Sequence, residues 1–220
     1  MLINRIKRKL TSKTNKALKT RWINKLKKRN KNTNVTIISN NCIAGVIYHN
    51  IGEQFCSPTI NLYIKGEDYL TFVKNLKYFS KCSMIDITEE ENLGFPVGRL
   101  ISNDSNIKSV NVYFQHYNNF LEAKNAWDKR FLRINYENIY FIWEFFENLY
   151  DIELLYEFDN SSLNTISLIH NDIPNLKNSF KFDCYDKTDK PGKLLQFKNF
   201  SGKRYLDDWD YISWLNNKNN

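Results

Sequence analysis

The stretch Val35-Thr-Ile-Ile-Ser39-Asn40-Asn41-Cys42 decides how the rest of this chain is interpreted. Its first four residues form a short apolar run typical of a buried strand, and the run stops at four small polar residues that favour a turn. In open α/β sheets, ligands bind beyond the carboxyl ends of the strands, so a polar loop here is a candidate binding site. The alternative is a turn whose Asn40 and Asn41 side chains hydrogen-bond only to their own backbone.

Apolar runs and amphipathic helical patterns alternate from residue 35 onward. Strands alternating with helices are typical of a largely parallel sheet covered on both faces. We therefore expect a single α/β domain over residues 35–220, with a three-layer α/β/α arrangement and a mostly parallel or mixed sheet. Strands are expected at 35–38, 60–64, 84–87, 110–115, 138–143 and 164–169, with weaker ones at 180–185 and 194–198, and helices at 67–80, 118–132, 145–159 and 207–216.

Polar residues follow three of the expected strands where each strand ends. They are Asn40 and Asn41 after the first strand, His116 after 110–115, and His170 and Asp172 after 164–169. If these strands are parallel, their polar residues meet at one edge of the sheet. His116 is the better acid–base candidate there, because an imidazole titrates near neutral pH. Asp172 is the alternative base or orients His170, and each histidine alone also fits a structural role.

The expected helix 118–132 carries arginine on the side that should face the core. With a rotation of 100° per residue, Arg130 falls inside the apolar arc and Arg133 lies at the edge of that arc. An unpaired buried charge is costly, so these arginines should meet an anion. Two anions fit: a carboxylate of the protein in a salt bridge, or a diphosphate or carboxylate ligand held by two parallel hydrogen bonds.

The excess positive charge of the chain lies in residues 1–34. They hold 13 of the 32 Lys and Arg residues and no Asp or Glu, while the whole chain has a net charge of +8. Leu18, Trp22 and Leu26 recur at helical spacing, and residues 2–10 carry a similar stripe. A basic amphipathic extension of this kind suits an anionic membrane surface or a partner. A solvated tail and nucleic-acid binding are the alternatives, and no recognisable nucleic-acid module supports the latter.

Motifs of several enzyme classes are missing from the sequence. There is no glycine-rich nucleotide loop, no HExxH or Cys/His zinc spacing, and no Gly-x-Ser-x-Gly elbow. No Asp-x-Asp ends a strand, so we expect no metal site and no cofactor, and we interpret Asp207 and Asp208 as a helix cap. Without Cys-x-x-Cys pairs, a secretory signal or a membrane-length apolar segment, reduced thiols and a cytoplasmic location are expected.

Several distinctive motifs are spaced over roughly residues 33–215. They are Ser39-Asn-Asn-Cys-x-x-Gly45, Phe55-x-Ser-Pro-Thr-x-Asn-Leu62, Phe95-Pro-Val-Gly98, Phe114-Gln-His-Tyr117, Glu122-Ala123, Trp127-Asp-x-Arg-x-x-Arg-Ile-Asn135 and Tyr205-Leu-Asp-Asp-Trp-Asp-Tyr211. Together they are similar to the motifs of a bacterial family of unknown function labelled exopolysaccharide biosynthesis proteins.

The resemblance implies a transferase in capsule or exopolysaccharide assembly, peripheral at the inner face of the plasma membrane. A glycosyltransferase with a nucleotide-sugar donor, for instance of galactofuranose, and a lipid-linked glycan acceptor is the first expectation. Arg130 and Arg133 would then bind donor phosphates, Asn40 and Asn41 sugar hydroxyls, with His170 beside them and His116 or Asp172 as base. The alternatives are an acyl or other substituent transferase, or a non-catalytic scaffold subunit.

Overall fold

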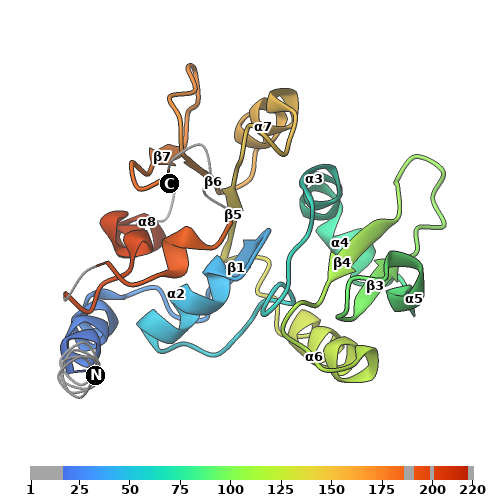
Figure 1. Cartoon of the computed structure of the whole chain (residues 1–220), viewed down its shortest axis with the longest axis horizontal. Coiled ribbons are helices and arrows are strands. Elements are labelled where there is room, and N and C mark those ends of the chain that lie inside the picture. The colour runs from blue at the N-terminus through green and yellow to red at the C-terminus, as the bar shows by residue number, and fades with distance from the viewer. Residues whose placement is uncertain (1–16, 186–190, 199–200, 218–220) are drawn as a thin grey trace, which may run out of the picture. The chain divides into compact units, whose positions relative to one another are not determined.

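The computed structural model describes residues 17–185, 191–198 and 201–217 (Figure 1). The expected apolar stripe in residues 2–10 lies outside them. The chain divides into two compact units, and one boundary between their sequence ranges falls within helix α2 (Ile43–Ile51). We call them the sheet unit, Asn34–Gly45 and Gln54–Lys181, and the terminal unit, Met1–Thr33, Val46–Glu53 and Phe182–Asn220.

A parallel sheet forms the first part of the sheet unit. Its strands are β1 (Thr36–Ser39), β5 (Ile139–Glu144), β6 (Thr165–Ile169) and β7 (Ser179–Lys181), in the order β1-β5-β6-β7. Every neighbouring pair is parallel, so β5 lies between β1 and β6 (Figure 1). The carboxyl ends of these strands therefore meet at one edge, and the α/β class expected from the sequence is confirmed.

A second, antiparallel sheet holds two strands that the sequence placed in the mostly parallel or mixed sheet, together with one strand that it did not predict. They are β2 (Met84–Asp86), β3 (Val97–Leu100) and β4 (Val110–Tyr113), in the order β2-β3-β4. The links between them are short, with α5 (Thr88–Glu91) in the first, and parallel pairing needs crossovers of about a dozen residues or more. The expected strand 60–64 is reduced to one bridge between Tyr63 and Tyr113.

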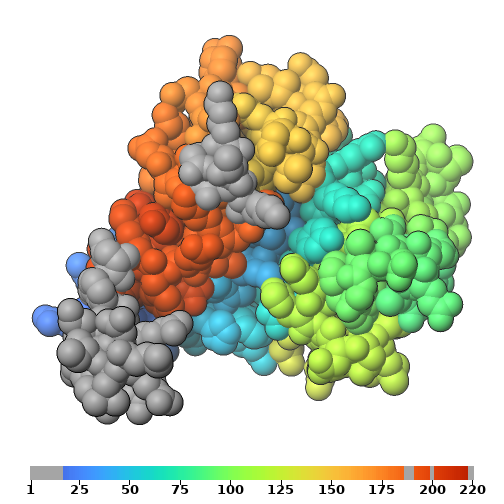
Figure 2. All heavy atoms as spheres, viewed as in Figure 1, coloured from blue at the N-terminus to red at the C-terminus, as the bar shows by residue number. Residues whose placement is uncertain are grey.

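The helices of the sheet unit follow local capping signals. They are α3 (Gly66–Lys74), α4 (Leu76–Phe79), α6 (Phe120–Phe131) and α7 (Ile152–Asp159). The Asn119 side chain accepts a hydrogen bond from the Glu122 N–H and starts α6, and Asp151 starts α7 in the same way, so the helix expected over 145–159 is shorter. Helix α6 buries Ala123, Trp127 and Phe131, while its yellow-green outer atoms form part of the surface in Figure 2.

One hydrophobic core joins the two sheets and these helices. Tyr69 from α3 is fully buried in it, with its ring edge against Trp143 of β5. The Tyr69 hydroxyl lies 2.7 Å from the Ile142 carbonyl oxygen and 3.1 Å from the Ile38 carbonyl oxygen. Burial raises the pKa of this phenol well above its usual value, so it remains a donor shared between β1 and β5.

The terminal unit joins the basic helix to the C-terminal residues. The described part of that helix covers 17–29, and with it belong η1 (Lys193–Leu195), η2 (Tyr205–Asp208) and α8 (Tyr211–Asn216). The expected strand 194–198 is therefore a single 3-10 turn with a following bridge, and the expected helix 207–216 begins only at Tyr211 because Trp209 and Asp210 are not helical.

Polar contacts tie the two ends of the chain together. Arg29 Nη2 lies 2.5 Å from Asp210 Oδ2, and the Asn216 amide donates to the Arg29 carbonyl oxygen. Asp210 also caps α8 through the Ser213 N–H, while Asp207 caps η2 and accepts a hydrogen bond from the Tyr211 hydroxyl. The basic helix is therefore part of a folded unit rather than a separate extension.

We expect Tyr69→Phe to lower the free energy of unfolding by about 1 kcal/mol, because it removes the donor shared by two buried carbonyl groups. Urea unfolding would measure the change. In the matched control, Tyr156→Phe, the lost hydrogen bond to the Pro174 carbonyl oxygen is exposed and should matter less. Equal effects of the two substitutions would contradict the role assigned to Tyr69.

Leu26 offers the test for the terminal unit, because its side chain is 2% exposed. Leu26→Ala should destabilise the protein by about 2–5 kcal/mol, as for other large-to-small substitutions in cores. Leu18→Ala, at a half-buried position of the same helix, should cost clearly less. If thermal unfolding shows no difference between the Leu26 variant and the parent, the helix is a dispensable extension after all.

Candidate functional site

The polar loop after β1 starts helix α2. The Ser39 hydroxyl accepts a hydrogen bond from the Ala44 N–H, and the Asn41 side-chain oxygen accepts one from the Ile43 N–H, each at 3.1 Å. Both contacts satisfy N–H groups that the first turn of a helix leaves without partners. Small polar residues at this place therefore end the strand and cap the helix in one step.

Asn40 extends the pairing of β1 with β5 through its side chain. Its Nδ2 donates to the Glu144 carbonyl oxygen at 3.1 Å, and its Oδ1 accepts from the Glu144 N–H at 3.0 Å. The Asn40 backbone N–H and C=O are also used, by Ile142 and Ile64. Because the side chain is buried and engaged on both polar atoms, we assign Asn40 to positioning Glu144 rather than to contact with sugar hydroxyls.

Glu144 is the centre of the site. Its side chain is 1% exposed, its Oε2 accepts from Asn41 Nδ2 at 2.5 Å, and its Oε1 lies 3.5 Å from His170 Nε2. The His170 ring packs on Phe146 with 4.6 Å between ring centroids. We call Asn41, Glu144 and His170 the Glu144 cluster; it lies at the carboxyl ends of β1, β5 and β6, where a buried carboxylate lies beside a mostly buried imidazole.

Tyr150 lies next to this cluster. Burial raises its pKa, and the negative charge of Glu144 raises it further. Gly66 makes room for the ring, because a Cβ at this position would lie 2.5 Å from Tyr150 Cδ1. Tyr150 is therefore a neutral phenol beside the carboxylate, available as a hydrogen-bond donor.

Lys65 adds a positive charge to the same region. Its ammonium nitrogen lies 4.4 Å from the centroid of the Tyr113 ring, which stacks on Tyr63. Burial alone would lower the pKa of Lys65, but the hydrogen bond to Tyr113 and nearby charges raise it overall. The side chain is exposed, so it can approach an anionic group of a ligand.

A second group, which we call the arginine cluster, consists of Arg130, Arg133 and Tyr117. Arg130 Nη1 donates to the Tyr117 hydroxyl at 2.5 Å and to the Ile60 carbonyl oxygen at 3.4 Å, and its guanidinium carbon lies 5.5 Å from the Phe55 ring centroid. Arg133 Nη1 donates to the Phe55 carbonyl oxygen at 3.4 Å. Within the described ranges, neither guanidinium forms an ion pair with a carboxylate, which removes the structural salt bridge expected as one alternative.

One loop connects the end of β1 with the arginine cluster. The Ser39 N–H donates to Thr59 Oγ1 at 3.1 Å, and the next residue, Ile60, provides the carbonyl oxygen that Arg130 and Tyr117 contact. Neighbouring Cα atoms are about 3.8 Å apart. The Ser57-Pro58-Thr59 segment therefore links the end of β1 to the arginine cluster.

His116 and Asp172 lie elsewhere than expected. His116 is exposed in the turn after β4, and because β4 belongs to the antiparallel sheet, the expected meeting of His116 with Asn41 at one edge of a parallel sheet is wrong. Asp172 follows β6 as expected, but its side chain is 89% exposed and pairs with Lys181 at 2.7 Å. Glu144 and Tyr150 were not among the candidates, although the acidic residue directly after the apolar run 139–143 was a usable signal.

No group of three or more His, Cys, Asp or Glu residues that could hold a metal ion occurs among the residues described. In the same ranges, no helix is both long and apolar enough to cross a membrane.

The chain belongs to the family described as "Domain of unknown function (DUF1919)", whose model matches residues 13–216. An uncharacterized protein of Haemophilus influenzae is 27% identical over 194 residues, which are 87% of this chain and 88% of that protein. The family match includes helix 17–29 and α8, so it covers both units. The family description names no activity, and the polysaccharide pathway implied by the resemblance stays a prediction.

Asn40→Ala should cost at least about 2 kcal/mol of unfolding free energy, because it leaves the buried N–H and C=O of Glu144 without their partners. Urea unfolding measures this loss. Asn125→Ala, on the exposed side of α6, is the matched control and should change stability by less than about 0.5 kcal/mol. An Asn40 variant as stable as the control would show that the side chain does not hold β1 to β5.

Proposed function

We propose that this protein is a transferase of bacterial surface polysaccharide assembly, a glycosyltransferase that uses a nucleotide-sugar donor and a lipid-linked acceptor at the inner face of the plasma membrane. The resemblance described above suggests the pathway. The Glu144 cluster is the observation that carries the proposal, because it provides a buried carboxylate–imidazole pair at the strand ends where α/β proteins bind ligands.

The chemistry that this pair supports is general base catalysis. In glycosyl transfer, an acceptor hydroxyl attacks the anomeric carbon, a new C–O bond forms, and the bond from that carbon to the donor phosphate oxygen breaks. His170 would take the hydroxyl proton, Glu144 would stabilise the resulting imidazolium, and Asn41 would hold the carboxylate in place. The bonding electron pair leaves with the nucleoside diphosphate.

The leaving group needs positive charge, and the arginine cluster is suited to supply it. Arg130 and Arg133 each use only Nη1 in the hydrogen bonds described above, so further N–H groups remain for phosphate oxygens. The Ser57-Pro58-Thr59 segment contacts the end of β1 and leads directly into Ile60, so we expect one ligand to contact both clusters. Lys65 is a further cation on the side of Tyr150.

A panel of nucleotide sugars, tested by thermal shift and then by transfer assay, examines the proposal. Glu144→Gln should keep donor affinity within about threefold of the parent and lower kcat by about 10²–10⁴, because the histidine loses its charged partner. Arg130→Lys should weaken donor binding by about 1–3 kcal/mol, since lysine keeps the charge but not the planar fork. Arg99→Lys, at an arginine already paired with Glu90, is the control.

The same panel separates the alternatives. A thermal shift with an acyl donor but with no nucleotide sugar would identify a substituent transferase. No shift with either class would favour a scaffold role and overturn the proposal. A donor affinity that Arg130→Lys leaves unchanged would remove the arginine cluster from the site.

A further inference from the structure

The basic helix shares its exposed side with a C-terminal strand pair. Phe197 and Arg204 form an antiparallel bridge, and the Lys198 N–H donates to the Lys203 carbonyl oxygen at 2.8 Å. Gly202, with φ of 73°, sets this pair against the helix, because a Cβ there would lie 2.4 Å from the Lys19 backbone nitrogen. The helix and the strand pair therefore form one built surface.

Two aromatic rings on this surface each carry one cation from the helix and one from the strand pair. The Lys203 ammonium lies 4.1 Å from the Trp22 ring centroid, and the Lys25 ammonium lies 5.7 Å from it. Phe197 has the Lys19 ammonium at 5.4 Å and the Arg204 guanidinium carbon at 5.2 Å. We call these six residues the cation–aromatic surface.

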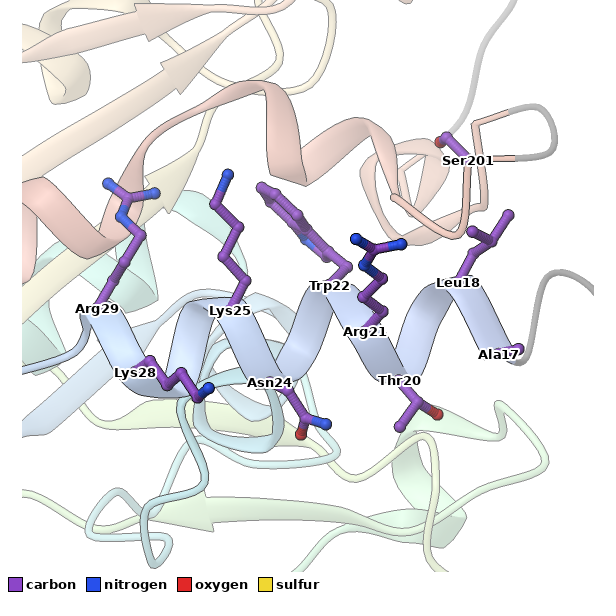
Figure 3. A pocket seen from close by; sticks show the side chains of 10 residues that line it. All are labelled: Ala17, Leu18, Thr20, Arg21, Trp22, Asn24, Lys25, Lys28, Arg29 and Ser201. Atoms are coloured by element: carbon purple, nitrogen blue, oxygen red, sulfur yellow. The ribbon is translucent and has the colours of Figure 1, made fainter.

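Carboxylates in the described ranges pair with some cations of the basic helix and of the strand pair, but not with the three lysines of this surface. Arg29 is paired with Asp210, and Lys198 with Asp208. Lys19, Lys25 and Lys203 form no ion pair with a carboxylate in the portion of the chain that is described. Figure 3 shows Arg21, Trp22 and Lys25 extending to the same side of the helix as Leu18, along an open groove of about 880 Å³ that Ser201 also lines.

We infer that the cation–aromatic surface binds the headgroups of anionic phospholipids, and that the contact needs the strand pair as well as the helix. Phe197 is 44% exposed. An exposed aromatic ring surrounded by cations is suited to the membrane boundary between lipid headgroups and acyl chains. Each Lys or Arg near an anionic membrane contributes about 1 kcal/mol, roughly fivefold in binding. The inference deepens the membrane part of the proposed function and rests on it.

The arrangement of the rings favours lipid over nucleic acid. Proteins that bind single strands stack bases on open aromatic faces. Here, cations from the protein itself already lie over the Trp22 and Phe197 rings, so these ring faces are less open to a stacked base.

Sedimentation with vesicles tests the inference on the full chain. The test vesicles contain phosphatidylcholine with about 30 mole per cent phosphatidylglycerol, which gives them a strong negative surface charge. The parent should bind these vesicles, bind pure phosphatidylcholine weakly, and dissociate at high salt. Lys25→Gln with Lys203→Gln, which removes one cation from each segment at Trp22, should weaken binding about 25-fold. Lys25→Arg with Lys203→Arg should bind like the parent.

The control is Lys81→Gln with Lys129→Gln, which removes the same charge from exposed positions of the sheet unit and should change vesicle binding by less than about twofold. Melting temperatures check that all variants fold, and the nucleotide-sugar thermal shift should be the same in all of them. Binding that the Trp22 double variant keeps, or that both double variants lose equally, would overturn the inference. Tighter binding of a DNA oligonucleotide than of anionic vesicles would overturn it as well. Vesicle binding and donor binding are measured separately. A chain that does not bind vesicles but shows a normal nucleotide-sugar thermal shift would overturn this inference and leave the proposed reaction standing.

Discussion

The pairing between the Asn40 side chain and the Glu144 backbone is the constraint on which the site depends. Strand β1 ends at Ser39, yet the Asn40 amide adds one more donor–acceptor pair to β5 by acting like a peptide group. This leaves the chain free to turn into α2 while β5 stays in register for one further residue. The carboxylate of that residue, Glu144, is thereby held between Asn41 and His170. The cost of burying a carboxylate is offset only when such partners are fixed, so backbone pairing and site chemistry form a single arrangement.

The fold class could be predicted from the sequence because apolar runs that end in polar loops mark buried strands, and β1, β5 and β6 lie where the pattern predicted them. Strand direction could not be predicted in the same way. The run over 110–115 is as apolar as a parallel strand, but it pairs with β3 in an antiparallel ladder. Strand β3 was not recognised because it begins within a short Pro-Val-Gly segment. Its Gly98 is needed for close packing, since a Cβ there would lie 2.7 Å from Met84 Sδ. The links on either side of β3 are too short for parallel crossovers, and their lengths are therefore what decides that these strands run antiparallel.

The candidate site shows the same division between local and tertiary information. Asn41 and His170 could be named because each follows an apolar run, and both contact Glu144. His116 satisfied the same local rule but follows a strand of the other sheet. For Arg130, helical periodicity correctly predicted a side chain turned inward, at a half-buried position. Its contacts with Tyr117, Ile60 and Phe55 could not be predicted, because they come from residues 13, 70 and 75 positions away and use a hydroxyl group, a carbonyl group and a ring face rather than an anion.

The basic helix carries two kinds of residue along one stretch of sequence: those that pack on the C-terminal residues and those that keep a positive charge at the surface. Leu26 and Arg29 face the C-terminal residues, where one is buried and the other is paired with Asp210. Lys19 and Lys25 instead extend over aromatic rings, where no described carboxylate neutralises them. Folding alone does not require these cations, since mutual repulsion among like charges opposes the compact state. The inference of an anionic lipid partner rests on this arrangement, because binding an anion would relieve the repulsion among charges that are held close together around two rings.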